Sequence, residues 1–219
     1  MTFTTDTFAF LNDLAANNSK DWFEANRDRY EAYWKSPAFD VIEALANFMA
    51  STKPKLKAEA RINGSLRRIN RDVRFSKDKS PYSASLHLVF WHGSHPNRSP
   101  GMHFVLRPEG VGFGAGQWAI EPERLAQLRS SIVNSPAKLQ DALSKANDAG
   151  CQLGAPDLAR LPKGFEAEGE AARLLRYKGF VARTQDSRAN PKAILGEEGL
   201  DWMRTRTEAC LPLLQWLSA

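Results

Sequence analysis

Long hydrophobic runs are absent from this sequence, and none of its apolar stretches approaches the ~20 residues that a membrane-spanning helix requires. The opening residues MTFTTDTFAFLNDL have no basic segment ahead of their apolar positions and already contain Asp6, so we expect no signal peptide. Cysteine is rare: Cys151 and Cys210 are the only two, and their spacing fits no metal or redox motif. These features predict a reduced, cytoplasmic protein that does not contact a membrane.

Familiar catalytic motifs are missing as well. The sequence contains no G-x-S-x-G, no Walker A loop and no H-E-x-x-H. His92 and His95 are close in sequence, but a loop pair remote from both cysteines is a weak zinc signal, so we predict no metal site. His87 and His103 each alternate with apolar neighbours, and either could act as a general acid or base if it reaches a bound phosphate or carbonyl. No motif assigns a cofactor or an oligomeric state.

Positive charge is in excess, and it is unevenly distributed. The 219 residues include 30 Lys and Arg against 25 Asp and Glu, which gives a net charge of +5. Residues 53–79 hold ten basic and three acidic residues, hence +7, so the rest of the chain sums to −2 (5 − 7). This asymmetry predicts an anion-facing surface. The alternative is a solvated strand edge on which Lys and Arg prevent aggregation.

The hydrophobic periodicity changes twice along the chain. Residues 1–50 follow helical spacing, with one helix in FAFLNDLAANN, a second from Ser19 to about Trp34 and a third that begins with Ser36 as its N-cap. Residues 58–118 alternate as strands do, in RRINRDVRF, SLHLVFW, GMHFVLRP and GVGFGAGQW. The last two of these strands should form a hairpin around RPEG.

Helical spacing returns in residues 121–219. It occurs in EPERLAQLRSSIV, in SPAKLQDALSKA with Ser135 as its cap, and in a closing helix that Pro212 could kink or end. RLLRYKGFVART could add one more strand. We therefore predict a single α+β domain over residues 1–219, in which N-terminal and C-terminal helices cover a mostly antiparallel central sheet of four or five strands.

The stretch INRDVRFSKDKSPYS combines dense charge with apolar residues. If residues 68–76 form a strand, alternation separates two faces. The apolar face, which we expect to meet the core, holds Ile69, Arg71, Val73 and Phe75, and the polar face holds Arg68, Asn70, Asp72, Arg74 and Ser76. Arg71 is the exception on the apolar face, where it is placed to reach a helix carboxylate such as Glu24 or Asp28.

The loop SKDKSPYS should turn the chain at the end of this polar face, because Ser, Asp and Pro favour turns. Arg offers a planar fork of donors to phosphate or carboxylate, and Lys supplies a point charge. Asp72, between two arginines, should have a lowered pKa and orient them, which leaves Asp78 as the better candidate base or metal ligand. The predicted anion-binding residues are Arg68, Arg71, Asp72, Arg74, Lys77, Lys79 and Tyr82, with Asp78 and His87 as candidate catalytic residues.

Three alternating glycines in GVGFGAGQW extend the predicted anion site. Gly112, Gly114 and Gly116 would share one strand face and leave bare backbone that a ligand or another segment can approach closely. The spacing is that of a strand and not of a dinucleotide fingerprint. The alternative is that a helix packs tightly over the glycines.

The run RINRDVRFSKDKSPYS is also similar to a motif of the domain of unknown function 2461 family, which occurs in bacteria and some fungi. FLNDLAANNSKDWFEANRDRYE, GVGFGAGQWAIEPERLAQLRSSI and LPKGF resemble further stretches of that family, so the resemblance covers about residues 8–217. Two positions depart from it: Ser83 stands where a lysine is common, and Asn70 where an aromatic residue is common. The resemblance implies no activity. It implies that certain residues recur, namely Asn17, Asn18, Trp22, Phe23, Arg71, Asp72, Arg74, Phe75, Ser76, Asp78, Lys79, Pro81, Tyr82, Gly114 and Gly116.

The sequence supports three different functions. The first is an enzyme that acts on a small phosphorylated or carboxylated substrate. The second is a binding module for nucleic acid or an acidic protein, whose affinity would fall steeply with salt. The third is a purely structural charge network that holds the sheet to the N-terminal helices. A small anionic ligand is the partner that the charge density favours, and nucleic acid is the other.

Overall fold

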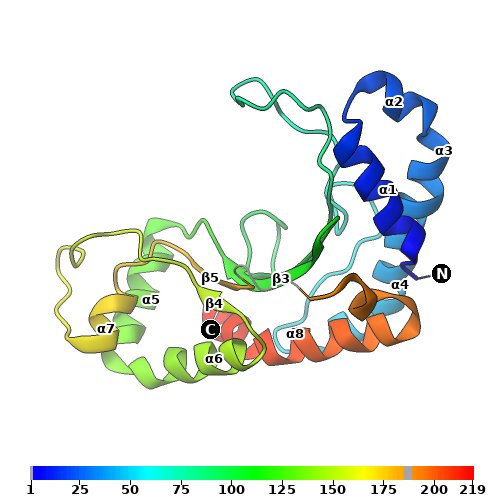
Figure 1. The fold of residues 1–219 in the computed structure, drawn as a ribbon. Helices are drawn as coiled ribbons and strands as arrows, with labels where there is room; N and C mark the ends of the chain where they lie inside the picture. The colour runs from blue at the N-terminus through cyan, green and yellow to red at the C-terminus, as the bar shows by residue number, and fades with distance from the viewer. Residues whose placement is uncertain (1, 185–188) are drawn as a thin grey trace.

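The N-terminal part of the chain is helical in the computed structural model, which describes residues 2–184 and 189–219 (Figure 1). Its elements are α1 (Thr5–Ala16), α2 (Lys20–Ala25), α3 (Arg27–Tyr30), the π-helical η1 (Glu31–Lys35) and α4 (Ser36–Ser51). The predicted helix start near Ser19 is confirmed, because Ser19 is the N-cap of α2 and its Oγ accepts a hydrogen bond from the backbone N–H of Trp22. The predicted cap at Ser36 is wrong: its own backbone is helical, at φ −62° and ψ −48°, and η1 continues directly into α4.

An antiparallel sheet of five strands forms the centre, which confirms the predicted α+β fold. Its strands are β1 (Leu86–Trp91), β2 (Gly101–Arg107), β3 (Gly110–Gln117), β4 (Gln152–Leu153) and β5 (Phe180–Arg183). They lie in the order β1-β2-β3-β5-β4. The predicted hairpin is confirmed, since Arg107 of β2 is the register partner of Gly110 of β3. The additional strand predicted in RLLRYKGFVART is confirmed for the last part of that stretch, which forms β5. The first residues of the stretch belong to a helix.

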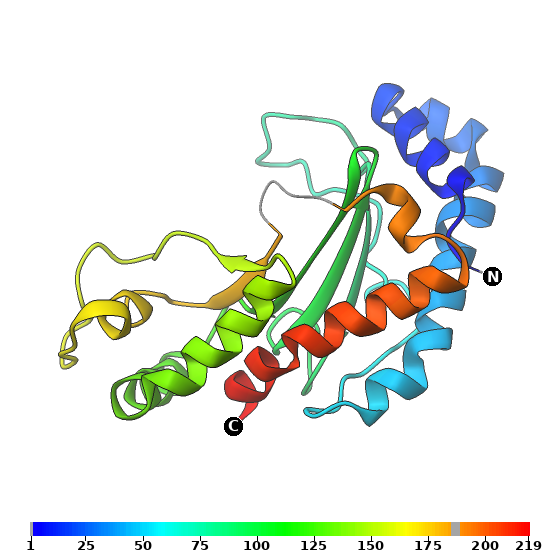
Figure 2. The same cartoon turned by 60° about the horizontal axis from the view of Figure 1, so that its bottom comes forward.

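Helices from the C-terminal half cover one face of the sheet (Figure 2). The elements are α5 (Pro122–Asn134), α6 (Pro136–Asp148), α7 (Gly169–Leu174), the 3₁₀-helical η2 (Pro191–Ile194) and α8 (Gly196–Ser218). Pro212 lies within α8 and does not end it. Ser135 occupies the N-cap position of α6 as predicted, although within the described chain its side chain accepts no hydrogen bond from an N–H of this helix. None of the described helices combines the length and apolar character needed to cross a bilayer.

Alternation along β2 separates the two faces of the sheet. The core that the sheet shares with α8 and the N-terminal helices takes Met102, Phe104 and Leu106. His103, Val105 and Arg107 are half-buried and belong to the opposite face. In Figure 1 this opposite face is the concave upper side of the sheet, which lies between the N-terminal helices and the segment that carries α7. The helices leave that face open.

Residues 68–76 do not form a strand, and this prediction is wrong. They belong to a long loop that leaves the sheet beside the N-terminal helices (Figure 1), with isolated bridges such as that between Asn70 and Tyr82. Ile69 is buried as predicted, but Phe75 is 96% exposed. The alternation of apolar and charged residues suggested a buried face, yet the loop extends beyond the layers of the fold, so no core receives Phe75.

Candidate functional site

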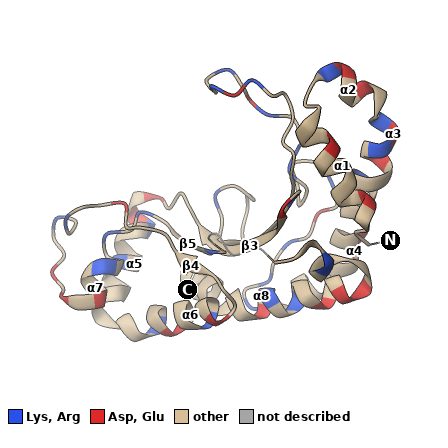
Figure 3. Ribbon diagram, viewed as in Figure 1, with Lys and Arg blue, Asp and Glu red and all other residues tan. Residues whose placement is uncertain are grey.

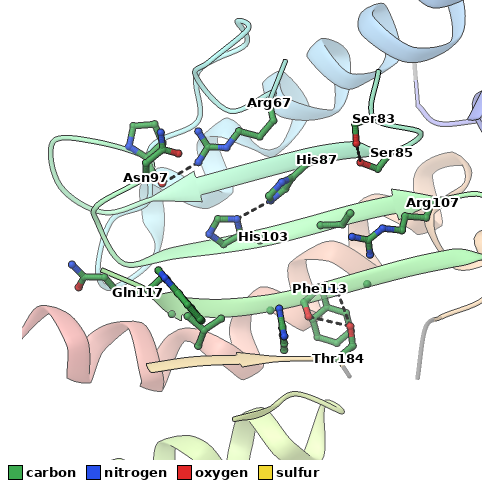
Figure 4. Close-up of a pocket in the computed structure, with 18 of the residues that line it drawn as sticks. Arg67, Ser83, Ser85, His87, Asn97, His103, Arg107, Phe113, Gln117 and Thr184 are labelled. Atoms are coloured by element: carbon green, nitrogen blue, oxygen red, sulfur yellow. Dashed lines mark hydrogen bonds between the residues drawn. The ribbon is translucent and has the colours of Figure 1, made fainter. Parts of the chain in front are cut away.

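A pocket of about 860 Å³ lies on the open face of the sheet (Figure 4). Strands β1, β2, β3 and β5 form its floor, and residues on both sides of β1 and in the β1–β2 loop form its walls. Its polar lining comprises Arg67, Ser83, Ser85, His87, Asn97, Ser99, His103, Arg107, Gln117, Arg183 and Thr184. The described lining residues therefore include three arginines but neither Asp nor Glu.

Two histidines form the centre of the pocket floor. His87 of β1 is the register partner of Val105, so it shares a face with His103 of β2. The Nε2 atom of His87 lies 2.9 Å from the Nδ1 atom of His103 (Figure 4). One ring must donate a proton in this hydrogen bond and the other must accept it, which requires that at least one imidazole is neutral.

Burial and neighbouring positive charge keep both histidines neutral. Burial, followed by the positive charges of Arg67 and Arg107, lowers the pKa of His87 to about 4. Burial, with contributions from His87 and Arg67, lowers the pKa of His103 to about 3. At neutral pH the pair therefore presents dipolar N–H and lone-pair groups to a ligand, and the positive charge of the pocket comes from its arginines.

Three arginines surround this histidine pair. The backbone N–H of Arg67 donates to the His87 carbonyl (3.0 Å), and its guanidinium donates to the Pro96 carbonyl (3.2 Å). Burial lowers the pKa of Arg67, although an arginine stays protonated at neutral pH. Arg107 lies at the end of β2, and Arg183 lies on the other side of the glycine-rich strand β3. Within the described chain the Arg67 guanidinium contacts a carbonyl and no carboxylate, so this partly buried cation is well suited to meet an anion.

The glycines of β3 allow β5 to approach closely. A Cβ atom on Gly114 would lie 2.6 Å from the Cβ atom of Arg183, and one on Gly116 would lie 2.0 Å from the Phe180 carbonyl oxygen. Gly116 also has a φ of +150°, which side-chain-bearing residues rarely adopt. The alternative of a helix packed over the glycines is wrong, because the segment that fills this space is a strand. The same glycines line the pocket floor, together with Gly112.

Most of the predicted anion-binding residues lie outside this pocket. The loop of residues 68–82, which we call the charged loop, projects away from the sheet (Figure 3). It holds Arg68, Arg71, Asp72, Arg74, Lys77, Asp78, Lys79 and Tyr82, none of which lines the pocket. Of the predicted site residues, His87, Gly112, Gly114 and Gly116 do line it.

Arg71 and Asp78 pair with each other within the charged loop. The Nη1 atom of Arg71 lies 2.5 Å from the Oδ2 atom of Asp78, so the predicted contact with Glu24 or Asp28 is wrong. Hydrogen bonds from the hydroxyl and N–H of Ser80, followed by that from Arg71, lower the pKa of Asp78 to about 2. A carboxylate with so low a pKa is a weak base at neutral pH.

The other charges of the loop are also engaged locally. The Nη2 atom of Arg74 lies 2.7 Å from the Oδ2 atom of Asp72, and this hydrogen bond lowers the pKa of Asp72 in the predicted direction. The Nζ atom of Lys79 donates to the Val73 carbonyl at 3.0 Å. In the described part of the chain, no three His, Cys, Asp or Glu side chains gather as metal ligands would. The loop thus resembles the structural charge network more closely than a preformed anion site.

Comparison with known proteins identifies the family alone. The profile of a family described as "Conserved hypothetical protein (DUF2461)" matches residues 6–216 of the 219-residue chain. The chain belongs to this family. Neither the curated proteins nor the solved structures contain a match. Membership in DUF2461 assigns no activity, so the function must be argued from the site.

The DUF2461 motif in the charged loop is tied to the N-terminal helices. Asn18 donates from Nδ2 to the Tyr82 carbonyl (2.9 Å) and accepts at Oδ1 from the Tyr82 N–H (3.1 Å). The Tyr82 ring stacks on Phe23, with centroids 4.1 Å apart. Directly after this anchor, Ser83 enters the pocket, where its Oγ lies 2.7 Å from the Oγ of Ser85 (Figure 4). The position at which the resemblance implies a common lysine is therefore a pocket position.

Sequence reasoning missed Arg67, Arg107 and Arg183 as site residues. Arg107 could have been identified from strand alternation, because it lies four residues after His103 in GMHFVLRP and therefore on the same face. Arg67 is the first residue of RRINRDVRF and directly precedes residues 68–76, to which we assigned the two strand faces. Arg183 could be placed only once β5 was known to pair with β3, a contact between segments more than sixty residues apart.

Proposed function

We propose that the pocket on the open face of the sheet binds a small phosphorylated or carboxylated ligand. The observation that carries this proposal is the lining: Arg67, Arg107 and Arg183 surround the pocket, and the described lining residues include no carboxylate. A guanidinium presents paired donors that match the oxygens of phosphate or carboxylate. Like charges that line one pocket repel each other, and a bound anion would offset that repulsion.

The remaining lining groups suit the same ligand. Hydroxyls of Ser83 and Ser85 lie at one end of the pocket, and the neutral imidazole of His87 can donate without adding charge. The volume of about 860 Å³ falls within the range of about 300–1,000 Å³ that is usual for small-molecule sites. Gly112, Gly114 and Gly116 line the same pocket, and their lack of side chains allows β5 to bring Arg183 to the floor.

The charged loop is a weaker candidate for the anion site. Arg71 and Arg74 already have carboxylate partners at 2.5 Å and 2.7 Å, and a ligand would have to displace them. Exposed ion pairs of this kind contribute little to stability, so a ligand could displace the two carboxylates at a small cost in free energy. A nucleic-acid duplex that followed the loop would show a steep decrease of affinity with salt. A small ligand that contacts the half-buried Arg67 and Arg107 should be less sensitive to salt.

A thermal-shift panel tests the proposal. Inorganic phosphate, phosphomonoesters, dicarboxylates and short duplexes are added at two salt concentrations to the wild type and to Arg183→Gln. A ligand at ~100 times its dissociation constant stabilises by about 2.7 kcal/mol, which is readily detected. We expect a small anion to stabilise the wild type at both salt concentrations and to lose most of this effect in Arg183→Gln. A shift caused only by duplexes, and lost at high salt, would contradict the proposal.

An acid–base enzyme is the second candidate. The observation in its favour is the hydrogen-bonded pair of His87 and His103 on the floor of the same pocket. A neutral imidazole next to a bound ester could accept a proton from an attacking group, and the second ring could relay it. This function would be supported if the wild type hydrolysed a phosphomonoester that it binds, and if His87→Gln bound the same compound without hydrolysing it. Binding without any turnover would limit the protein to the first function.

A further inference from the structure

A tryptophan stands at one end of the pocket with its ring exposed. Trp118 directly follows β3 and lines the pocket beside Gln117, and 76% of its surface is accessible. The other five tryptophans of the chain are buried or half-buried. Because a tryptophan ring offers a large flat apolar surface, its exposure at a ligand pocket suggests that the ligand covers it.

The backbone around Trp118 is held firmly. The Nε2 atom of Gln117 donates to the Arg98 carbonyl (2.6 Å) and to the Ala119 carbonyl (3.2 Å), which ties the end of β3 to the β1–β2 loop. A Cβ atom on Gly179 would lie 2.1 Å from the Trp118 carbonyl oxygen, so the chain before β5 packs directly on this peptide. The ring therefore projects from a fixed point, and ordering it on a ligand costs little side-chain entropy.

Cationic and polar groups lie within reach of the ring. Gly114, the register partner of both His103 and Arg183, is four residues before Trp118, which corresponds to ~13 Å at ~3.3 Å per residue along β3. From the other side, the Arg67 guanidinium contacts the Pro96 carbonyl in the β1–β2 loop, which also lines the pocket. The pocket thus combines a flat aromatic surface at one end with cations across its floor.

We propose that the ligand of this pocket is a nucleoside phosphate, whose base stacks on Trp118 and whose phosphate meets the arginines. This inference rests on the proposed anion-binding function and specifies the class of anion. Bases stack on aromatic side chains irrespective of sequence, and side-chain amides pair with their edges. Asn97 places such an amide at the end of the pocket that holds Gln117, the neighbour of Trp118 in the chain (Figure 4), whereas the Nε2 atom of Gln117 is committed to the Arg98 and Ala119 carbonyls. A sugar phosphate would satisfy the arginines and leave the ring uncovered.

Isothermal titration with matched ligands tests the inference. Adenosine monophosphate, ribose phosphate and inorganic phosphate are compared on the wild type, on Trp118→Ala and on Phe75→Ala. Phe75 is the matched control, because it is the other strongly exposed aromatic residue and lies in the charged loop, outside the pocket. We expect the nucleotide to bind the wild type at least about tenfold more tightly than ribose phosphate, which is about 1.4 kcal/mol. Trp118→Ala should remove this advantage without weakening ribose phosphate, and Phe75→Ala should keep it.

The outcomes separate this inference from the proposed function. If the nucleotide and ribose phosphate bind equally well and both require Arg183, the anion site stands and the nucleotide assignment is wrong. If none of the three ligands binds, both are wrong. A short single-stranded deoxythymidine oligonucleotide is titrated as a further ligand. Binding that is much tighter than that of thymidine monophosphate, and equally dependent on Trp118, would identify the nucleotide as part of a strand, whereas equal or weaker binding would identify the free nucleotide.

Discussion

The Nε2 atom of His87 and the Nδ1 atom of His103 lie 2.9 Å apart, on the floor of a pocket whose charged lining residues, where described, are all arginines. Two strands supply this pair, and alternation places both rings on the face that the described helices leave open. The pair is polar and neutral, since burial and the adjacent arginines depress both pKa values. Its titration provides the first test of the site.

Acid should destabilise the protein through these two histidines. Their pKa values in the folded state are about 4 for His87 and about 3 for His103, below the ordinary value of 6.5. The unfolded chain therefore binds more protons than the folded one, and stability decreases as pH falls from about 6.5 towards these values. Each histidine contributes a slope of at most about 1.4 kcal/mol per pH unit in that window. Urea unfolding across this pH range measures the slope.

Substitution of the pair should flatten that slope. His87→Gln and His103→Gln each remove one titrating group, so the free energy of unfolding should depend less on pH than in the wild type. His92→Gln serves as the control, because His92 does not line the pocket and contacts the Lys55 carbonyl instead. An unchanged slope in both pocket variants would show that these histidines already titrate normally in the folded protein.

Gly114→Ala should destabilise the sheet. The added Cβ would lie 2.6 Å from the Cβ atom of Arg183 and 2.7 Å from the Ala182 carbonyl oxygen, so β5 would have to move. We expect a loss of about 1–3 kcal/mol, as for other overpacked sites. Gly154→Ala is the control, because a Cβ atom there meets no atom within 4 Å. Equal urea midpoints for the two variants would refute the close approach of β5.

Ser83→Lys should strengthen anion binding. Ser83 lines the pocket beside Ser85, and a lysine there would add a fourth cation without displacing a backbone contact of the anchor at Tyr82. We expect the dissociation constant for phosphate to fall by about tenfold or more, since a hydrogen bond to a charged group contributes about 1.5–3 kcal/mol. Ser130→Lys on the exposed side of α5 adds the same charge elsewhere and should change nothing. Equal effects of both variants in isothermal titration would indicate a general charge effect.

The two cysteines should be unreactive in the folded protein. Although they are far apart in sequence, the Cys210 thiol hydrogen-bonds with Cys151, and this contact together with burial raises the pKa of Cys210. A thiol that stays protonated is a poor nucleophile. Ellman's reagent should therefore detect both thiols in urea and neither in native buffer. Rapid reaction of one thiol in native buffer would place it at the surface.

The elements that were predicted correctly have local signals. The helical spacing of α1, α5, α6 and α8, and the alternation in β1 to β3, follow from which residues each element buries. Residues 68–76 carried the same alternation but form a loop. Charged residues next to Ile69 and Val73 imitate a half-buried strand, and only the tertiary structure shows that Phe75 is exposed outside the core.

The candidate site was predictable only in part. His87 and the glycines of β3 were visible because each shares a strand face with its neighbours. The three arginines were not identified, since a pocket depends on which strands become neighbours. Arg183 reaches the site through the pairing of β5 with β3, and this pairing of distant segments leaves no periodic signal. The charged loop was predicted to be the anion site because of its high density of charge, although Arg71 and Arg74 form ion pairs within the loop.

A direct comparison of one arginine from each location tests the central claim. Isothermal titration measures the dissociation constant of the tightest phosphomonoester for the wild type, for Arg183→Gln in the pocket and for Arg74→Gln in the charged loop. If the pocket is the anion site, Arg183→Gln weakens binding by about tenfold or more, as expected for loss of a charge-assisted hydrogen bond. Arg74→Gln then binds like the wild type. Weakened binding in Arg74→Gln with unchanged binding in Arg183→Gln would instead move the anion site to the charged loop.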